Sequence, residues 1–170
     1  MNVADGRTLG EGRESLLCSS GAEVRAAALA MVRQARRTLD ICGRQLDPHL
    51  FDNAEFGDEV RKLATGSRNA RVRLLVLLPE QLYQHRHHLL RLAHELASFV
   101  HVRVPGEDHK GFNEAMLIVD ETGYIHRSLS DRYEGIAHFN NAKFAGELTR
   151  RFDEIWEHGE IDQHFRRLSL

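Results

Sequence analysis

The densest group of side chains able to bind a metal or an anion is the run Gln84-His85-Arg86-His87-His88, followed by His94. Apolar residues around it recur at helical spacing, which predicts one helix over residues 81–97. On that helix His85 and His88 share a face, but no third ligand stands at a spacing typical of zinc sites. The simplest interpretation is a solvated basic face. A surface for phosphate or nucleic acid is the first alternative and a metal site the second.

Three further histidines, His109, His126 and His138, are candidates for acid–base catalysis because imidazole changes charge near neutral pH. His109 is followed by a lysine and a glycine, which is typical of an ordinary polar turn. A phosphodiesterase or nuclease built on these histidines would need them to meet Asp120 or Glu134 in one cleft. The sequence leaves this hypothesis open.

Arginines around the first predicted strand could bind phosphate or carboxylate through paired hydrogen bonds. They are Arg33, Arg36, Arg37 and Arg44. Because Asp40, Asp47 and Asp52 are close in sequence, we expect them to neutralise much of this charge.

The composition is that of an ordinary globular domain: 170 residues, 42% hydrophobic, 28% charged and a net charge of −2. Such a charge gives no overall attraction to nucleic acid or anionic lipid. There is no membrane-length apolar run and no export signal at the start, so we expect a cytoplasmic protein. Cys18 and Cys42 are then buried thiols rather than a disulfide. No glycine-rich phosphate loop or Cys-x-x-Cys pair indicates a cofactor, and we expect none.

Strand and helix patterns alternate along the first half, which favours an α/β fold with a mixed sheet flanked by helices on both faces. We expect a flexible tail over residues 1–13 and one domain over 14–170. One predicted helix begins at Ser20-x-x-Glu23 and ends near residue 37, and a second begins at Asp52 and ends near residue 66. The predicted strands cover residues 39–42, 72–78, 99–104 and 135–139. A hairpin is predicted over 115–126, a long helix carrying Phe144 to Trp156, and a turn at 162–167.

Residues 112–157 carry a recognisable order of motifs. Counting back from Asp120 at the end of its strand gives Ala115 and Asn113, and counting forward gives Arg127-Ser128-Leu129-Ser130. Glu134 and Phe152-x-x-x-Trp156 follow. This order resembles the phospholipase D-like superfamily, whose signature is His-x-Lys-x4-Asp, six residues, then Gly-Ser-x-Asn, a later Glu and a helix ending in Phe-x-x-x-Trp. More narrowly, the chain resembles uncharacterised proteobacterial domains of this fold, some of them found beside acetyltransferase domains.

The resemblance places Asn113 at the histidine and Ala115 at the lysine. In that family the histidine attacks phosphorus, the lysine neutralises the phosphoryl oxygens and the aspartate, here Asp120, orients a histidine. An amide is neither nucleophile nor proton shuttle near pH 7, and a methyl group supplies no charge. Losing either group costs on the order of 10³-fold in rate. We therefore expect no catalytic residue at these positions and no phospholipase D chemistry.

Arg127 replaces the family's glycine, so its side chain either contacts an anion or pairs with Asp120 or Glu134 and plugs the cleft. The candidate ligand-binding residues are Asn113, Asp120, Arg127, Ser128 and Glu134. Two such half-domains pair about a two-fold axis in the family, which implies a homodimer. The sequence thus predicts a non-catalytic domain that binds an anionic ligand or a protein partner, one version of the latter being an adaptor for an acetyltransferase. Nucleic acid is a weaker possibility.

Overall fold

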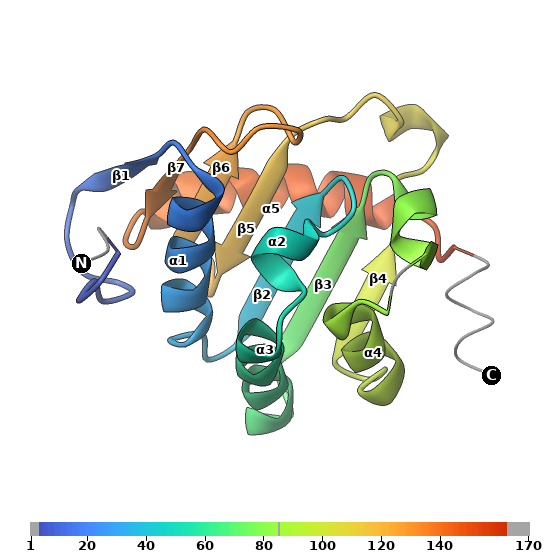
Figure 1. The fold of residues 1–170 in the computed structure, drawn as a ribbon, viewed down its shortest axis with the longest axis horizontal. Coiled ribbons are helices and arrows are strands. Elements are labelled where there is room, and N and C mark those ends of the chain that lie inside the picture. Colours follow the sequence, from blue (N-terminus) through green and yellow to red (C-terminus); the bar gives the residue numbers. More distant parts are fainter. Residues whose placement is uncertain (1–3, 85, 163–170) are drawn as a thin grey trace.

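The computed structural model describes residues 4–84 and 86–162, which form one seven-stranded sheet with helices on both faces (Figure 1). The strand order is β1-β7-β6-β5-β2-β3-β4. The strands are β1 (Ser15–Cys18), β2 (Thr38–Gly43), β3 (Arg71–Val76), β4 (Val100–Arg103), β5 (Ala115–Val119), β6 (Gly123–Arg127) and β7 (Gly135–His138). The α-helices are α1 (Gly21–Val32), α2 (Pro48–Phe51), α3 (Ala54–Gly66), α4 (His88–Glu95) and α5 (Ala142–Glu157).

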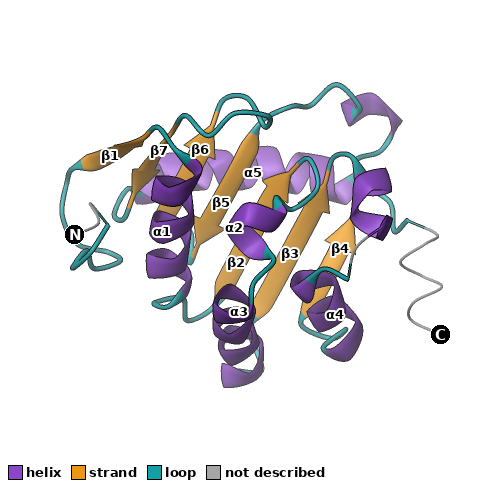
Figure 2. Cartoon of the chain, viewed as in Figure 1, coloured by secondary structure: helices purple, strands orange, loops and turns teal. Residues whose placement is uncertain are grey.

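The sheet is mixed, as the sequence predicts. β2, β3 and β4 are parallel, whereas β5 runs antiparallel to β2, and β6, β7 and β1 continue antiparallel (Figure 2). Helix α5 crosses one face, and α1 to α4 cover the other. Because β5 reverses direction beside β2, the end of β2 and the start of β5 lie at one edge of the sheet.

A buried ion pair joins the two central parallel strands. On β3, Arg73 donates from Nε and Nη2 to both carboxylate oxygens of Asp40 on β2, at 2.8 and 2.9 Å. Its third nitrogen contacts Asp153 of α5 at 2.8 Å, and the guanidinium lies 4.7 Å from the ring centroid of Phe152. Asp40 is only 1% exposed and its charge is matched mainly by Arg73, while Arg71 approaches it at 3.9 Å.

The element bounds correct several predictions. The helix predicted over residues 81–97 is broken into a 3-10 helix, Pro79–Gln84, and α4, with His87 as the N-cap of α4. The first helix ends at Val32 rather than near residue 37, and β1 was not predicted because four residues are too short for a clear alternation.

The start of the chain contacts the domain over its described part. Leu9 N–H donates to Gln34 Oε1 at 2.7 Å, and Gly10 N–H donates to the Phe139 carbonyl at 2.8 Å. Residues predicted as a tail therefore pack against α1 and the end of β7. The turn predicted at 162–167 lies almost wholly outside the described residues. Among the described helices, none combines the length and apolar character needed to cross a membrane.

We expect Asp40→Ala to lower the free energy of unfolding by about 3–5 kcal/mol, because it leaves the buried Arg73 without its main counter-charge. Urea unfolding followed by circular dichroism measures the change. Asp153→Ala is the control: its side chain is 41% exposed, so we expect a loss of no more than about 1 kcal/mol. Equal losses in the two variants would contradict the central role of the Asp40 pair.

Candidate functional site

Most positions that the resemblance aligns with the phospholipase D-like motif gather at one edge of the sheet, here called the Asn113 edge. β2 ends there at Gly43, β5 begins at Ala115 and β6 ends at Arg127, which pairs directly with Ala115. Asn113 precedes β5 and is exposed. Its carbonyl accepts the Ser130 N–H at 2.8 Å, and the Ser130 hydroxyl lies 2.5 Å from Asn113 Oδ1. The two positions that the resemblance aligns with the motif's first His and last Asn thus bind each other.

Arg127 is the central side chain of this edge and is only 6% exposed. Its Nη1 donates to the Arg132 carbonyl at 2.8 Å, and its guanidinium carbon lies 5.7 Å from the centroid of the Tyr133 ring. No carboxylate of a described residue lies within ion-pair distance of it. Burial lowers the pKa of Arg127, although the nearby charge of Asp47 opposes this effect. The pairing predicted with Asp120 or Glu134 is therefore wrong.

Tyr133 and Asp47 complete the surroundings of Arg127; Tyr133 was not predicted at any site, and Asp47 was predicted only beside the arginines around the first strand. The Tyr133 hydroxyl bonds to Asp47, and burial together with that bond raises the pKa of Tyr133. Asp47 also caps α2 by accepting the His49 N–H at 3.0 Å. The loop after β6 and the loop after β2 are joined in this way over the side chain of Arg127.

The space inside the Asn113 edge is nearly filled. A hole of about 10 Å³ remains, lined by apolar side chains and by Cys42, Ala115 and Arg127. That volume is at the lower limit for one water molecule and leaves no room for a phosphate group. Burial raises the pKa of the Cys42 thiol, so it is not a nucleophile near neutral pH.

Asp120 lies at the opposite edge of the sheet. Seven residues of extended chain, roughly 20 Å, separate it from Asn113. Its carboxylate accepts the N–H groups of Arg36, Arg37 and Thr38 at 2.8–2.9 Å. Asp120 therefore neither orients a histidine nor shares a ligand site with Asn113. Its backbone has the left-handed conformation, with φ 52°, at the start of the turn between β5 and β6.

The other two candidate ligand residues, Ser128 and Glu134, are exposed on the loop between β6 and β7. They border the Asn113 edge but make no side-chain hydrogen bond or ion pair with a described residue. Ligand binding by Asn113, Arg127, Ser128 and Glu134 stays a prediction.

The candidate catalytic histidines do not converge. His126 Nε2 binds Glu114 Oε1 at 2.7 Å, on the sheet face that α5 covers, opposite to the face of Arg127. His138 is buried and accepts the Asn140 N–H, while His109 lies near Glu154 beyond the end of β4. None of the three meets Asp120 or Glu134. Within the described residues, no group of three metal-binding side chains occurs.

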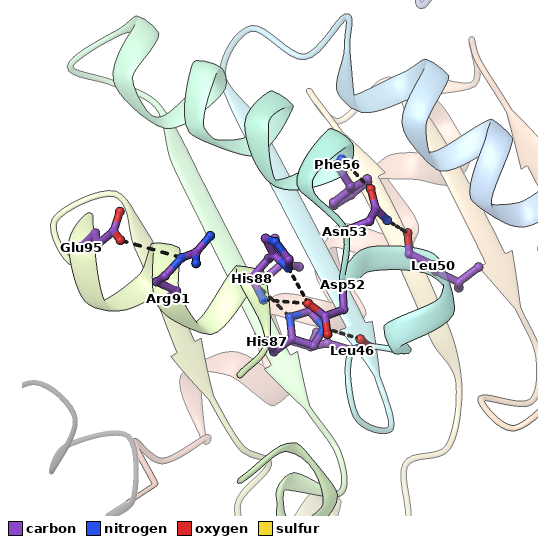
Figure 3. A network of polar contacts seen from close by, with 10 residues as sticks. Leu46, Leu50, Asp52, Asn53, Phe56, His87, His88, Arg91 and Glu95 are labelled. Carbon is purple, nitrogen blue, oxygen red and sulfur yellow. Dashed lines mark hydrogen bonds and ion pairs between the residues drawn. The ribbon is translucent and has the colours of Figure 1, made fainter. Parts of the chain in front are cut away.

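Two histidines of the predicted basic face, His87 and His88, instead attach α4 to the rest of the domain, whereas His94 is exposed (Figure 3). Asp52 Oδ1 accepts both the main-chain N–H and the ring Nδ1 of His88, at 2.9 and 2.6 Å. His87 Nδ1 accepts the Leu89 N–H at 3.1 Å, so its Nε2 carries the proton that is donated to the Leu46 carbonyl, 2.7 Å away. Asp52 was predicted to cap α3, but Asn53 has that role. His85 lies outside the described residues.

Comparisons with known proteins agree with this fold. A family model described as "Domain of unknown function (DUF7931)" matches residues 20–168, and no curated protein sequence matches the chain. Three similar solved structures are the archaeal chromatin protein TrmBL2 (16% identity, TM-score 0.64, 88% of this chain and 54% of that chain), the phospholipase D family member Nuc from Salmonella typhimurium (15%, 0.58, 86% and 97%), and phosphatidylserine synthase from Haemophilus influenzae (16%, 0.58, 92% and 40%). The chain therefore spans about half of TrmBL2 and nearly all of Nuc. These likenesses confirm a phospholipase D-like fold.

We expect stability to fall as pH drops below about 6.5, the ordinary pKa of histidine, because burial lowers the pKa of His87 in the folded chain. Below that pH the unfolded chain binds a proton that the folded chain does not. Each further pH unit therefore lowers the free energy of unfolding by at most about 1.4 kcal/mol. Burial raises the pKa of Asp52, but the hydrogen bonds from His88 outweigh it and lower that pKa overall. Asp52 therefore stabilises the fold above its ordinary pKa, and this contribution is lost only at lower pH.

His87→Asn tests this assignment, since asparagine retains an N-cap acceptor but does not titrate. Urea unfolding at pH 7 and pH 5.5 should show a smaller loss of stability in His87→Asn than in the wild type. His94→Asn, which changes an exposed histidine of the same helix, should behave like the wild type. Identical pH dependence in His87→Asn and the wild type would rule out His87 as the source.

Proposed function

Because the chain belongs to the DUF7931 family and has the phospholipase D-like fold, we propose that it is a non-catalytic domain that acts as a homodimer through a protein-binding surface at the Asn113 edge. One observation carries the proposal: Arg127, at the position where the resembled motif has glycine, is buried at this edge beside Ala115. The hole that remains there measures about 10 Å³.

The chemistry of the edge supports this proposal. Asn113 has no nucleophilic lone pair, and it already binds Ser130. Ala115 brings no positive charge to the site. Arg127 cannot take the role of the missing lysine, because the Arg127 guanidinium faces the Arg132 carbonyl and the Tyr133 ring. An arginine also remains protonated near neutral pH, so it does not transfer protons. A phosphoryl-transfer step would therefore lack both its attacking group and its anion stabiliser.

The competing hypothesis is a phosphodiesterase or nuclease with other catalytic histidines. His126 and Glu114 form the best placed pair, but Arg151 also binds this carboxylate, at 3.1 Å, and the imidazole ring lies against Phe144. The pair is on the face of the sheet that α5 covers. It therefore favours a structural contact between β5, β6 and α5 over catalysis.

A protein partner suits the Asn113 edge better than a small anion does. The interior is closed, whereas Asn113, Ser128 and Leu129 are exposed, and Leu129 is an apolar side chain that is 45% accessible. The chain corresponds to nearly all of Nuc but to 40% of phosphatidylserine synthase. Pairing of two copies about an axis near this edge, which the family resemblance implies, would bring the exposed residues of both copies together.

We expect no hydrolysis of a phosphodiester such as bis(p-nitrophenyl) phosphate above the rate of buffer, because the site lacks a nucleophile. The assay should be repeated with a DNA substrate and across pH 5–9. His109→Asn and His126→Asn are the decisive variants. Turnover by the wild-type chain that disappears in either variant would overturn the non-catalytic proposal.

We expect sedimentation velocity at micromolar concentration to show a dimer. Leu129→Arg should shift it towards the monomer, because it places a charge in the proposed contact. Ile161→Arg is the matched control: Ile161 is 46% exposed and follows Glu160, which bridges to Val104 after β4, and β5, β2 and β3 lie between β4 and β6. A wild-type chain that is monomeric, or a dimer broken by the Ile161 change alone, would contradict dimerisation through the Asn113 edge.

A further inference from the structure

The edge of the sheet opposite Asn113 carries six cations on two neighbouring chain segments, and we call it the basic edge. One segment joins α1 to β2, and the other covers the last turns of α3 and the turn into β3. The cations are Arg33, Arg36, Arg37, Lys62, Arg68 and Arg71. In Figure 1 this edge lies at the bottom, where β2 and β3 begin.

Parallel pairing brings the two segments together. Thr38 at the start of β2 is in register with Arg71 at the start of β3, and the Arg71 N–H donates to the Arg37 carbonyl at 2.9 Å. Residues more than thirty positions apart in the sequence therefore present their side chains at one edge. The predicted grouping of Arg44 with Arg36 and Arg37 is wrong, because Arg44 follows β2 at the Asn113 edge.

Most arginines of the basic edge lack an ion-pair partner in the described part of the chain. Arg36, Arg37 and Arg68 are exposed and make no ion pair there. Arg71 reaches Asp40 only at 3.9 Å, and its buried Nε has no hydrogen-bond partner among the described atoms. Arg33 and Lys62, by contrast, are paired with the neighbouring Glu55 and Glu59.

Of the aspartates that we expected to neutralise nearby arginines, only Asp40 approaches an arginine of the basic edge, Arg71, at 3.9 Å. Asp40 is buried and bound to Arg73, while Asp47 and Asp52 lie beyond the other end of β2. Asp120 is at the basic edge, but three main-chain N–H groups occupy its carboxylate. Glu121 is the remaining exposed carboxylate beside Arg37 and Arg71.

Two adjoining hollows follow the basic edge. One, of about 240 Å³, is lined by Arg37, Thr38, Asn69, Arg71, Asp120 and Glu121. The other, of about 340 Å³, is lined by residues of α1 and α3, among them Arg33, Arg36 and Lys62. Different residues of the segment 32–38 line each of them, so the two hollows follow one another along the basic edge, and we call them together the groove. Neither hollow is lined by an aromatic side chain.

We propose that the basic edge binds the phosphate backbone of double-stranded nucleic acid. Arginine matches phosphate with two parallel hydrogen bonds, and an extended groove suits a row of phosphates. Single strands are usually held by aromatic side chains on which bases stack, and the groove lining offers none. The exposed large apolar side chains of the described chain lie outside both hollows, so insertion into a lipid surface has no support.

Fluorescence anisotropy of a labelled 24-base-pair DNA with the full chain, from 50 to 200 mM salt, tests the proposal. Three to four phosphate contacts give a slope of log K against log salt of about −3 to −4. Arg36→Gln with Arg37→Gln should weaken binding at least tenfold at 50 mM salt and reduce the slope by about 2. Both changes leave the main-chain bonds to Asp120 intact. Glu121→Gln should tighten binding, because it removes a like charge to phosphate.

The double variant Arg44→Gln with Arg150→Gln is the matched control, since it removes two exposed, unpaired arginines outside the groove. It should bind as the wild type does, and urea unfolding shows whether each variant is folded. Lack of binding at 50 mM salt would overturn the proposal, as would equal losses in both double variants or tighter binding of the single strand. Arginine-dependent binding to vesicles containing phosphatidylserine, without binding to DNA, would assign the groove to lipid headgroups and would also overturn it.

Discussion

The antiparallel pairing of β5 with β2 in the middle of the sheet is the constraint on which both edges depend. Because β5 runs against β2, its first residues meet the end of β2, and its last residue meets the beginning. The Asn113 edge and the groove of arginines are therefore joined by a single strand of five residues. Asp120 fixes its far end by accepting three N–H groups from the α1–β2 connection, which holds Arg36 and Arg37 in place. A residue that the resemblance aligns with the phospholipase D-like motif thus positions the opposite edge in this chain.

The interior of the Asn113 edge is filled by the positively charged side chain of Arg127, which is buried without a carboxylate partner. Such burial costs several kcal/mol unless other contacts offset it. Here the offsetting contacts are the Arg132 carbonyl, the face of Tyr133 and the more distant Asp47. Gly135 makes room for them, because a Cβ atom at that position would lie 2.7 Å from Arg127 Cγ and 2.6 Å from the His126 carbonyl oxygen. A larger residue at position 135 would therefore require the arginine and the adjacent main chain to move.

The buried and the exposed arginines have different roles. Arg73 and Arg127 are buried and have fixed partners, so they help to specify the folded structure. The arginines at the start of β2 and β3 remain exposed and mostly unpaired, so their attraction is available to a ligand and is weakened by salt. A net charge of −2 conceals this division, because the carboxylates that balance it lie elsewhere on the surface or in the interior.

The sequence by itself determined the fold class, the hairpin of β5 and β6, and the long helix α5, because periodic apolar residues and turn signals act over short distances. The resemblance read from it also predicts that a nucleophile and a lysine are missing at residues 113 and 115. Only the tertiary structure decided which charged groups meet. Asp120 and Arg127 are seven residues apart along the chain yet lie at opposite edges, whereas Arg37 and Arg71 are far apart in sequence and adjacent in space. Strand direction and register set these distances, and no local pattern of residues encodes them.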